Sequence, residues 1–343
     1  MILENNVATV IPQLAGFVFR KFAGADDYAA MVDVINAARV ADSIEEQVTI
    51  DVIANDFEHL SNTDPQKDIL MIDADGRLVG FGLVRWWQND VGEWVYGMNA
   101  DVHPQWRGMG IGRRLLEWQE TRLREIAATH PATGLKYLQV FCMERAQMRL
   151  ALLKHAGYEV IRYGFMMVRP DLADVPDEWP LPDGLETRPV LPEHRRAIWE
   201  AMDEAFRDHW GHRAGTEEDY QGFINWPEAQ PELWQVAWDT RTNEVAGMVL
   251  NTVFANENEK YGIKRGWTDP IFVRRPWRRQ GLARALIMRS LKVLRDAGMT
   301  EAALGVDAQN PNKALHLYES CGYRQYQRSF TMRKPLERLE TGE

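Results

Sequence analysis

The chain has 343 residues, with 40 basic and 50 acidic side chains and a formal net charge of −10 at pH 7, which excludes general attraction to nucleic acid or to an anionic membrane. Its only cysteines, Cys142 and Cys321, are too few for a disulfide framework and lack the paired spacing of a zinc site, so we expect no metal. No segment reaches the roughly 18 apolar residues of a membrane helix, and the N-terminus lacks the features of a signal peptide; we therefore expect a cytoplasmic protein.

The predicted elements of the first half mix strands and helices. Apolar alternation indicates strands, and apolar residues at helical spacing indicate helices. In chain order we expect a strand at 17–21, a helix at 26–39, a hairpin formed by 69–72 and 78–85, a strand at 94–102, a helix at 110–127, a strand at 137–142 and a helix at 146–156.

A proline-rich and acidic stretch follows. Four prolines and five acidic residues lie between residues 170 and 184, and prolines cannot continue a helix or a central strand. We therefore predict an N-terminal domain at 1–170, a linker at 171–184 and a C-terminal domain at 185–343.

The second half repeats the same order of elements. We expect strands and helices at 186–189, 192–206, 233–239, 244–251, 267–273, 281–296, 302–306 and 311–321. An internal repeat supports this order, because 102–112 aligns with 273–283 without a gap and 152–158 aligns with 317–323. The pattern predicts an α/β (α+β) protein of two duplicated domains, each a mixed, mostly antiparallel sheet flanked by helices.

The most informative segment of each half is a glycine-rich turn between a strand and a helix. It reads Arg278-x-x-Gly281-x-Ala283 in the second half and Arg107-x-x-Gly110-x-Gly112 in the first. Small residues let the backbone approach a ligand, and the free N–H groups of a helix's first turn bind anions, so a pyrophosphate is the expected ligand. The expected contacts of the second loop are Arg278, Arg279, Gln280, Gly281, Leu282, Ala283 and Arg284.

These loops resemble the R/Q-x-x-G-x-G/A loop of the GNAT acyltransferases, which holds the pyrophosphate of acetyl-CoA. The later segment from Asn310 to Tyr323 is similar to the N-x-x-A-x-x-L-Y-x-x-x-G-F/Y pattern of that family and adds Asn312 to the expected cofactor contacts. The tandem arrangement resembles the mycothiol-synthase-like two-domain acetyltransferases. The resemblance covers most of both halves and implies acetyl-CoA as the co-substrate.

The resemblance also implies where catalysis takes place. The family splays its fourth strand from its fifth, which would place the backbone of Ile271, Phe272 and Val273 along the acyl-pantetheine, where N–H groups could stabilise an oxyanion. Tyr318 matches the tyrosine that protonates the departing thiolate, although it could also be only a half-buried aromatic side chain. Asp269 is the candidate base, and its alternative role is that of a residue at a bend or bulge before Pro270.

The first copy departs from this pattern. Leu153 replaces the tyrosine and Met98 replaces the candidate base, so we expect this copy to be catalytically degenerate. Its loop is intact, and two readings stay open: it binds an acyl-CoA, or it is retained as a turn of the fold. The candidate contacts there are Val102, Arg107, Gly108, Gly110 and Gly112.

The acceptor is expected to enter over residues 201–226. Asp208, His209 and Trp210 are the candidate substrate contacts, because an acidic and aromatic wall suits a cationic amine; the alternative is a solvated helix followed by an ordinary loop. The resulting hypothesis is an acetyltransferase that moves an acetyl group from acetyl-CoA to a primary amine of a small molecule in a ternary complex. The rival hypothesis is a non-catalytic acyl-CoA sensor or scaffold. The expected assembly is a monomer with pseudo-dimeric domains or a homodimer.

Overall fold

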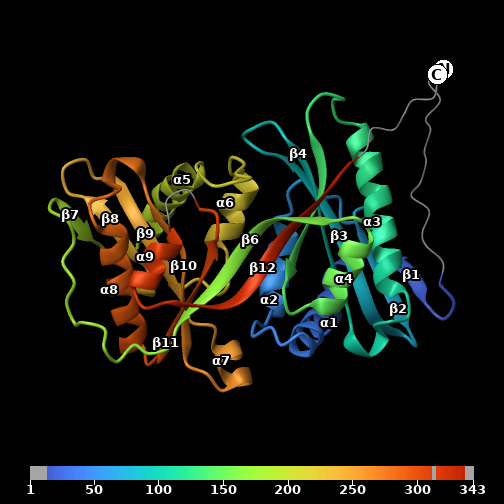
Figure 1. The fold of residues 1–343 in the computed structure, drawn as a ribbon, viewed down its shortest axis with the longest axis horizontal. Coiled ribbons are helices and arrows are strands. Elements are labelled where there is room, and N and C mark those ends of the chain that lie inside the picture. The colour runs from blue at the N-terminus through green and yellow to red at the C-terminus, as the bar shows by residue number, and fades with distance from the viewer. Residues whose placement is uncertain (1–13, 311–313, 337–343) are drawn as a thin grey trace.

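The computed structural model describes residues 14–310 and 314–336. Within these residues the strands form a single twelve-stranded sheet with helices on both of its faces (Figure 1). The strands are β1 (Val18–Lys21), β2 (Ile69–Ala74), β3 (Arg77–Gln88), β4 (Trp94–Val102), β5 (Lys136–Met143), β6 (Glu159–Arg169), β7 (Leu185–Thr187), β8 (Gln235–Asp239), β9 (Val245–Thr252), β10 (Arg265–Val273), β11 (Glu301–Asp307) and β12 (Arg324–Pro335). The α-helices are α1 (Tyr28–Ala41), α2 (Ile50–Glu58), α3 (Ile111–Ala128), α4 (Gln147–His155), α5 (Arg195–Phe206), α6 (Glu217–Ile224), α7 (Ala255–Tyr261), α8 (Leu282–Asp296) and α9 (Ala314–Ser320).

The order of the strands reflects the internal repeat. It runs β1-β2-β3-β4-β5-β12-β6-β11-β10-β9-β8-β7. The strands β1 to β6 of the first half correspond in turn to β7 to β12 of the second, so the order read from one edge matches the order read from the other. The sheet is mixed and mostly antiparallel, since only β4 with β5 and β10 with β11 pair in parallel among the described strands. The predicted fold class is therefore confirmed.

Two long strands join the halves. β12, at the end of the second half, pairs with β5 of the first half, while β6 pairs with β11 of the second. These two strands also pair with each other, so β6 and β12 lie antiparallel and side by side in the middle of the molecule (Figure 1). The sequence analysis identified neither strand, nor the helices α2, α6 and α7.

Each half buries apolar side chains on both faces of its sheet. In the first half α3 and α4 cover one face and α1 and α2 the other; in the second half α8 and α9 cover one face and α5 the other. Residues 170–184 contain no helix or strand and pack against the second half, with Leu172 and Val175 in its core. No helix in 14–310 or 314–336 is long and apolar enough to cross a membrane.

The two parallel strand pairs are short, and each leaves an opening in the sheet where its strands separate. β10 pairs with β11 only from Arg265 to Trp267, after which β11 continues along β6 while β10 stays with β9. β4 likewise pairs with β5 only from Trp94 to Gly97. Beyond these points the two strands of each pair diverge, and the edge of β10 from Thr268 to Val273 faces the gap.

Candidate active site

The loop before α8 forms an open cradle. Gly281 is the N-cap residue of α8 with φ 86°, and Arg279 also has a positive φ of 61°. A Cβ atom built on Gly281 would meet no atom of residues 14–310 or 314–336 within 4 Å, so within these residues the space beside Gly281 is open. The exposed helix N-terminus leaves backbone N–H groups available to an anion.

The arginine that begins the motif is used by the protein itself. Arg278 donates to the Val273 carbonyl oxygen at 2.8 Å, and its guanidinium donates to Asp208 Oδ2 at 2.6 Å. Arg107 makes the same contacts in the first half, with the Val102 carbonyl oxygen at 3.3 Å and with Asp42 at 2.7 Å. In both halves this arginine braces the turn against the first long helix, and it is Arg279 and Arg284 that remain exposed beside the loop.

Asp208 therefore lies under the phosphate loop. Hydrogen bonds from Arg275 and Arg278 hold the pKa of its carboxyl well below the ordinary value. It does not line the acceptor cavity described below, and its place in the structure is that of a brace for the loop. Gln280 is exposed, and its side-chain amide donates to the Pro276 carbonyl oxygen at 2.9 Å. Asn312 lies outside the described residues.

A cavity of about 620 Å³ extends from the loop into the gap beside β10. It is lined by the loop, by the diverging end of β10 and by one face of α9. The lining residues are Ala205, His209, Ile271, Phe272, Val273, Trp277, Arg278, Arg279, Gly281, Leu282, Ala283, Arg284, Asn310, Ala314, Leu317 and Tyr318. The strand, the loop and the tyrosine singled out from the sequence thus surround one cavity, which we call the cofactor cavity.

Tyr318 faces the cofactor cavity from α9 and is almost fully buried, with 7% of its surface exposed. Burial raises the pKa of its phenol far above neutrality, and the negative charge of Asp269 adds to this shift. Its ring lies edge-on to Tyr323, with the centroids 6.3 Å apart. The phenol is consequently a neutral proton donor at physiological pH.

A second cavity, of about 540 Å³, lies between the halves, and we call it the acceptor cavity. Its walls come from β5, β6 and β12 and from the α1–α2 connection on one side, and from β10, β11 and the α5–α6 connection on the other. The lining residues are Glu46, Phe141, Met143, Arg162, Tyr163, Gly164, Phe165, Met166, His209, Trp210, Trp267, Asp269, Gly305, Val306, Asp307, Ser329 and Thr331. His209 lines both cavities, so the two meet at this side chain.

Asp269 lies in β10 at a register shift between Thr268 and Ile271, and its peptide bond to Pro270 is cis. Asp269 is exposed toward the acceptor cavity, yet the protein atoms around its carboxylate partly desolvate it and raise its pKa to about 6. The Gly305 N–H donates to Asp269 Oδ2 at 3.1 Å and partly offsets the shift. Such a carboxylate is ionised at neutral pH yet basic enough to accept a proton.

Charged and aromatic side chains surround this carboxylate. Arg162 donates to Asp307 at 2.9 Å, while Glu46 enters the cavity from the first half. Trp210 lies between two guanidinium groups, with its ring centroid 5.1 Å from that of Arg162 and 4.4 Å from that of Arg333. Burial lowers the pKa of His209, which therefore favours the neutral imidazole.

The first half keeps the geometry of the loop but has other side chains at the positions of Tyr318 and Asp269. Gly110 is the N-cap residue of α3 with φ 91°, and a Cβ atom there would lie 3.9 Å from Leu14. Leu153 is buried at the position of the tyrosine. From α4, Arg149 reaches the diverging end of β4, where it donates to Asn99 at 2.9 Å. The turn at Gly110 also contains Gly108, and Val102 and Gly112 lie on either side of it.

Sequence reasoning missed the residues that the first half and the exchanged strands contribute to the acceptor cavity. Glu46, Arg162 and Asp307 come from three separate segments, and no motif links them. The only available signals were the acidic pair at 45–46 and an aspartate directly after an apolar strand. Among the described residues no group of three or more His, Cys, Asp or Glu side chains could hold a metal ion.

Comparison with known proteins gives consistent results. The model of the acetyltransferase (GNAT) family matches residues 195–323, and that of an acetyltransferase (GNAT) domain matches residues 65–160. A mycothiol acetyltransferase of Thermomonospora curvata is 32% identical over 237 residues, which are 66% of this chain and 69% of that protein. The mycothiol acetyltransferase of Thermobifida fusca is 28% identical over 241 residues, covering 65% of this chain and 69% of that protein. The crystal structure of a GCN5-related N-acetyltransferase from Sphaerobacter thermophilus superposes with a TM-score of 0.69 at 26% identity, over 95% of this chain and 97% of that one.

Proposed function

The chain belongs to the GNAT family of acetyltransferases, with two such domains in tandem, and we propose that it transfers the acetyl group of acetyl-CoA to a primary amine, with the chemistry in the second half. The observation that carries the proposal is the meeting of the two cavities at His209. One cavity contains the phosphate loop and Tyr318, and the other contains Asp269. An acyl donor and an amine bound in them would lie end to end, as direct attack in a ternary complex requires.

The cofactor cavity suits acetyl-CoA. The open turn at Gly281 and the exposed Arg279 and Arg284 would bind the pyrophosphate. The edge of β10 beyond Thr268, without a partner strand on the β11 side among the described residues, would hydrogen-bond to the pantetheine amides and leave an N–H group for the carbonyl oxygen. Acetyl-CoA itself supplies the activated thioester.

An amine that binds as its ammonium ion first releases one proton to solvent, and two further proton transfers follow. The neutral amine attacks the thioester carbonyl carbon, a C–N bond forms, and the carbonyl oxygen becomes the oxyanion. As the C–S bond breaks, Tyr318 donates its phenolic proton to the departing thiolate. Asp269 accepts the proton that the substituted ammonium loses, directly or through a water molecule. Burial and the negative charge of Asp269 both raise the pKa of the Tyr318 phenol, so the phenolate formed in the reaction would readily regain a proton after product release.

The acceptor cavity favours a cationic amine with an apolar or ring-containing body. Of the three carboxylates in its lining, Asp307 pairs with Arg162 and Glu46 lies 3.6 Å from Arg39, so it is the charge of Asp269 that would attract a cationic amine. Trp267, Tyr163 and other aromatic side chains line the same space and suit cation–π contacts, whereas Trp210 is already engaged by Arg162 and Arg333. The names of the relatives make an amine related to mycothiol the first compound to try.

The test is a screen of primary amines with acetyl-CoA, in which release of the CoA thiol is followed and the acetylated product is identified by mass spectrometry. The panel contains mycothiol-related amines, aminoglycosides, polyamines, aromatic amines and peptide N-termini. We expect amine-dependent thiol release with at least one class. Tight acetyl-CoA binding without thiol release across the whole panel would contradict the proposal and favour an acyl-CoA sensor.

A further inference from the structure

The segment that brings His209 and Trp210 to the acceptor cavity is the connection between α5 and α6, residues 207–216, which we call the acceptor loop. It contains no helix or strand. A ten-residue segment of this kind would lose considerable conformational entropy on ordering, roughly 1–2 kcal/mol for each residue, unless other contacts hold it in place. The contacts that hold it are therefore relevant to how well the cavity is formed before a ligand arrives.

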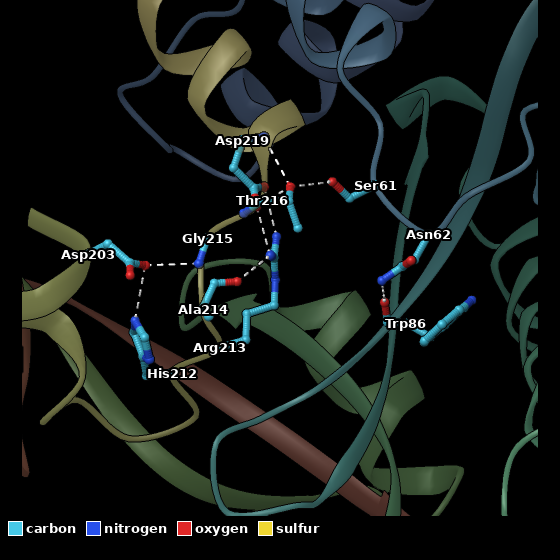
Figure 2. A network of polar contacts seen from close by, with 10 residues as sticks. All are labelled: Ser61, Asn62, Trp86, Asp203, His212, Arg213, Ala214, Gly215, Thr216 and Asp219. Atoms are coloured by element: carbon cyan, nitrogen blue, oxygen red, sulfur yellow. Dashed lines mark hydrogen bonds and ion pairs between the residues drawn. The ribbon is translucent and has the colours of Figure 1, made fainter. Parts of the chain in front are cut away.

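One anchor of the acceptor loop is His212, which lies between two carboxylates. Its Nδ1 lies 2.7 Å from Oδ2 of Asp90, in the β3–β4 turn of the first half, and donates to it because a carboxylate oxygen can only accept. Its Nε2 lies 3.5 Å from Oδ1 of Asp203 on α5, and that oxygen also accepts from the Gly215 N–H at 2.9 Å (Figure 2). In the other direction, the Asp90 N–H donates to the His212 carbonyl oxygen at 2.9 Å.

Side-chain hydrogen bonds also hold the rest of the acceptor loop, from Arg213 to Thr216. Arg213 forms two 2.8 Å hydrogen bonds with Asp219, and the Thr216 hydroxyl lies 3.5 Å from that of Ser61 in the first half (Figure 2). The His212 side chain is only 9% exposed, so its ring is shielded from water, whereas the Asp90 carboxylate that it contacts is half exposed. Among the hydrogen bonds described between this loop and the first half, the two between His212 and Asp90 are shorter than the Thr216–Ser61 contact. His212 follows Trp210 by two residues in the sequence.

We propose that His212 is a positioning residue for the acetyl acceptor: through its bond to Asp90, the first half fixes the acceptor loop and so sets the affinity for the amine. This inference rests on the proposed function to the extent that the loop forms one wall of the acceptor cavity. The physical reason is a population effect, because a loop that adopts the binding conformation for only a fraction of the time weakens apparent affinity by that fraction. It also gives the first half a task in the reaction, although it lacks the catalytic side chains.

The test uses the full-length protein with Asp90→Ala. Asp90 is 48% exposed, so its loss should not prevent folding. We expect hydrogen exchange of the amides in 207–216 to become about three- to tenfold faster, in line with the loss of one hydrogen bond to a half-exposed carboxylate. With tyramine as the acceptor, the KM for the amine should rise by a similar factor, while kcat and the Kd of acetyl-CoA stay within about twofold.

Two further variants separate positioning from a general loss of structure. Asp90→Asn keeps an oxygen that accepts from Nδ1, and it should restore most of the slow exchange and the low KM. Asp177→Ala removes a different exposed carboxylate, which pairs with Arg295 at 2.6 Å on the second half, and it should leave both quantities unchanged.

Unchanged exchange of 207–216 in Asp90→Ala would overturn the inference, as would faster exchange without a rise in the KM for tyramine. The exchange measurement needs neither acetyl-CoA nor amine. A failure of the proposed function would appear separately, as absence of thiol release by the parent protein.

Discussion

The pH dependence of catalysis should reveal Asp269. Replacement by asparagine keeps the size of the side chain and an oxygen for the Gly305 N–H, but it removes the proton acceptor. We expect kcat to fall about a hundredfold to ten-thousandfold at neutral pH, the usual range for general base catalysis. Acetyl-CoA affinity should change little, because Asp269 lines the acceptor cavity and not the cofactor cavity.

The size of the pH effect follows from the pKa of about 6. At pH 7 about nine-tenths of such a carboxylate is ionised and at pH 5 about one-tenth, whereas a carboxylate with the ordinary pKa would still be about nine-tenths ionised at pH 5. The assay is the ratio of kcat in the parent to kcat in Asp269→Asn between about pH 5 and pH 8. Protonation of the acceptor amine affects both proteins equally and cancels in this ratio.

The ratio should fall about tenfold from its plateau as the pH is lowered to 5, with a midpoint near 6. Asp307→Asn is the matched control, since it removes another carboxylate from the same cavity, one already paired with Arg162, and should not reproduce this pH course. A parent-to-variant ratio that is constant from pH 5 to pH 8 would refute the assignment of Asp269 as the base.

The same pKa shift has a consequence for stability. Because folding raises the pKa of Asp269 above its ordinary value of 3.8, the fold disfavours the ionised form, and stability decreases as the pH rises through the interval from 3.8 to about 6. Asp269→Asn should therefore have a higher Tm than the parent above pH 6 and the same Tm below pH 3.8. A lower Tm for the variant at pH 7 would show that the ionised carboxylate stabilises the fold.

Two further residues give independent predictions. Tyr318→Phe keeps the packed ring but removes the buried proton donor, so kcat and kcat/KM should both fall about a hundredfold or more while acetyl-CoA affinity measured by calorimetry is retained; kcat within about threefold of the parent would mean that another group protonates the thiolate. Glu257 is 5% exposed and its pKa is raised to about 7 by burial, so its ionisation destabilises the fold as the pH rises from 4.5 to 7. Glu257→Gln, which can still accept from the Gln47 N–H, should be more stable than the parent by up to about 3 kcal/mol in urea unfolding at pH 8 and equally stable below pH 4.5, and equal stability at both would contradict this reasoning.

Much of each half could be predicted from the sequence because its signals are local. A glycine that must adopt a positive φ at a strand-to-helix turn leaves a recognisable motif, and the motif occurs at both Gly110 and Gly281. Hydrophobic periodicity likewise located the flanking elements, and the family, the fold class and the enzymatic activity inferred from these motifs are confirmed.

The acceptor cavity could not be predicted in the same way, because it depends on long-range strand pairing. β12 lies beside β5, far from it in the sequence, and no local pattern distinguishes this arrangement from pairing within the second half. Arg162 therefore gave no recognisable signal, and the acidic pair at 45–46 did not by itself place Glu46 in the cavity. Asp208 shows the opposite difficulty: an acidic residue in a loop suggested a substrate contact, yet two nearby arginines engage it beneath the phosphate loop.

The most direct test of the account compares the same substitution in the two loops. Gly281→Val and Gly110→Val both place a β-branched residue at a positive φ, 86° and 91°, so their stability costs should match, at about 1–2 kcal/mol each. The measurement is the steady-state rate of CoA thiol release by each variant with acetyl-CoA and the best amine of the panel. We predict that Gly281→Val loses more than about nine-tenths of kcat/KM for acetyl-CoA while Gly110→Val retains most of it. Loss of turnover in Gly110→Val, with Gly281→Val as active as the parent, would place the chemistry in the first half and contradict the account.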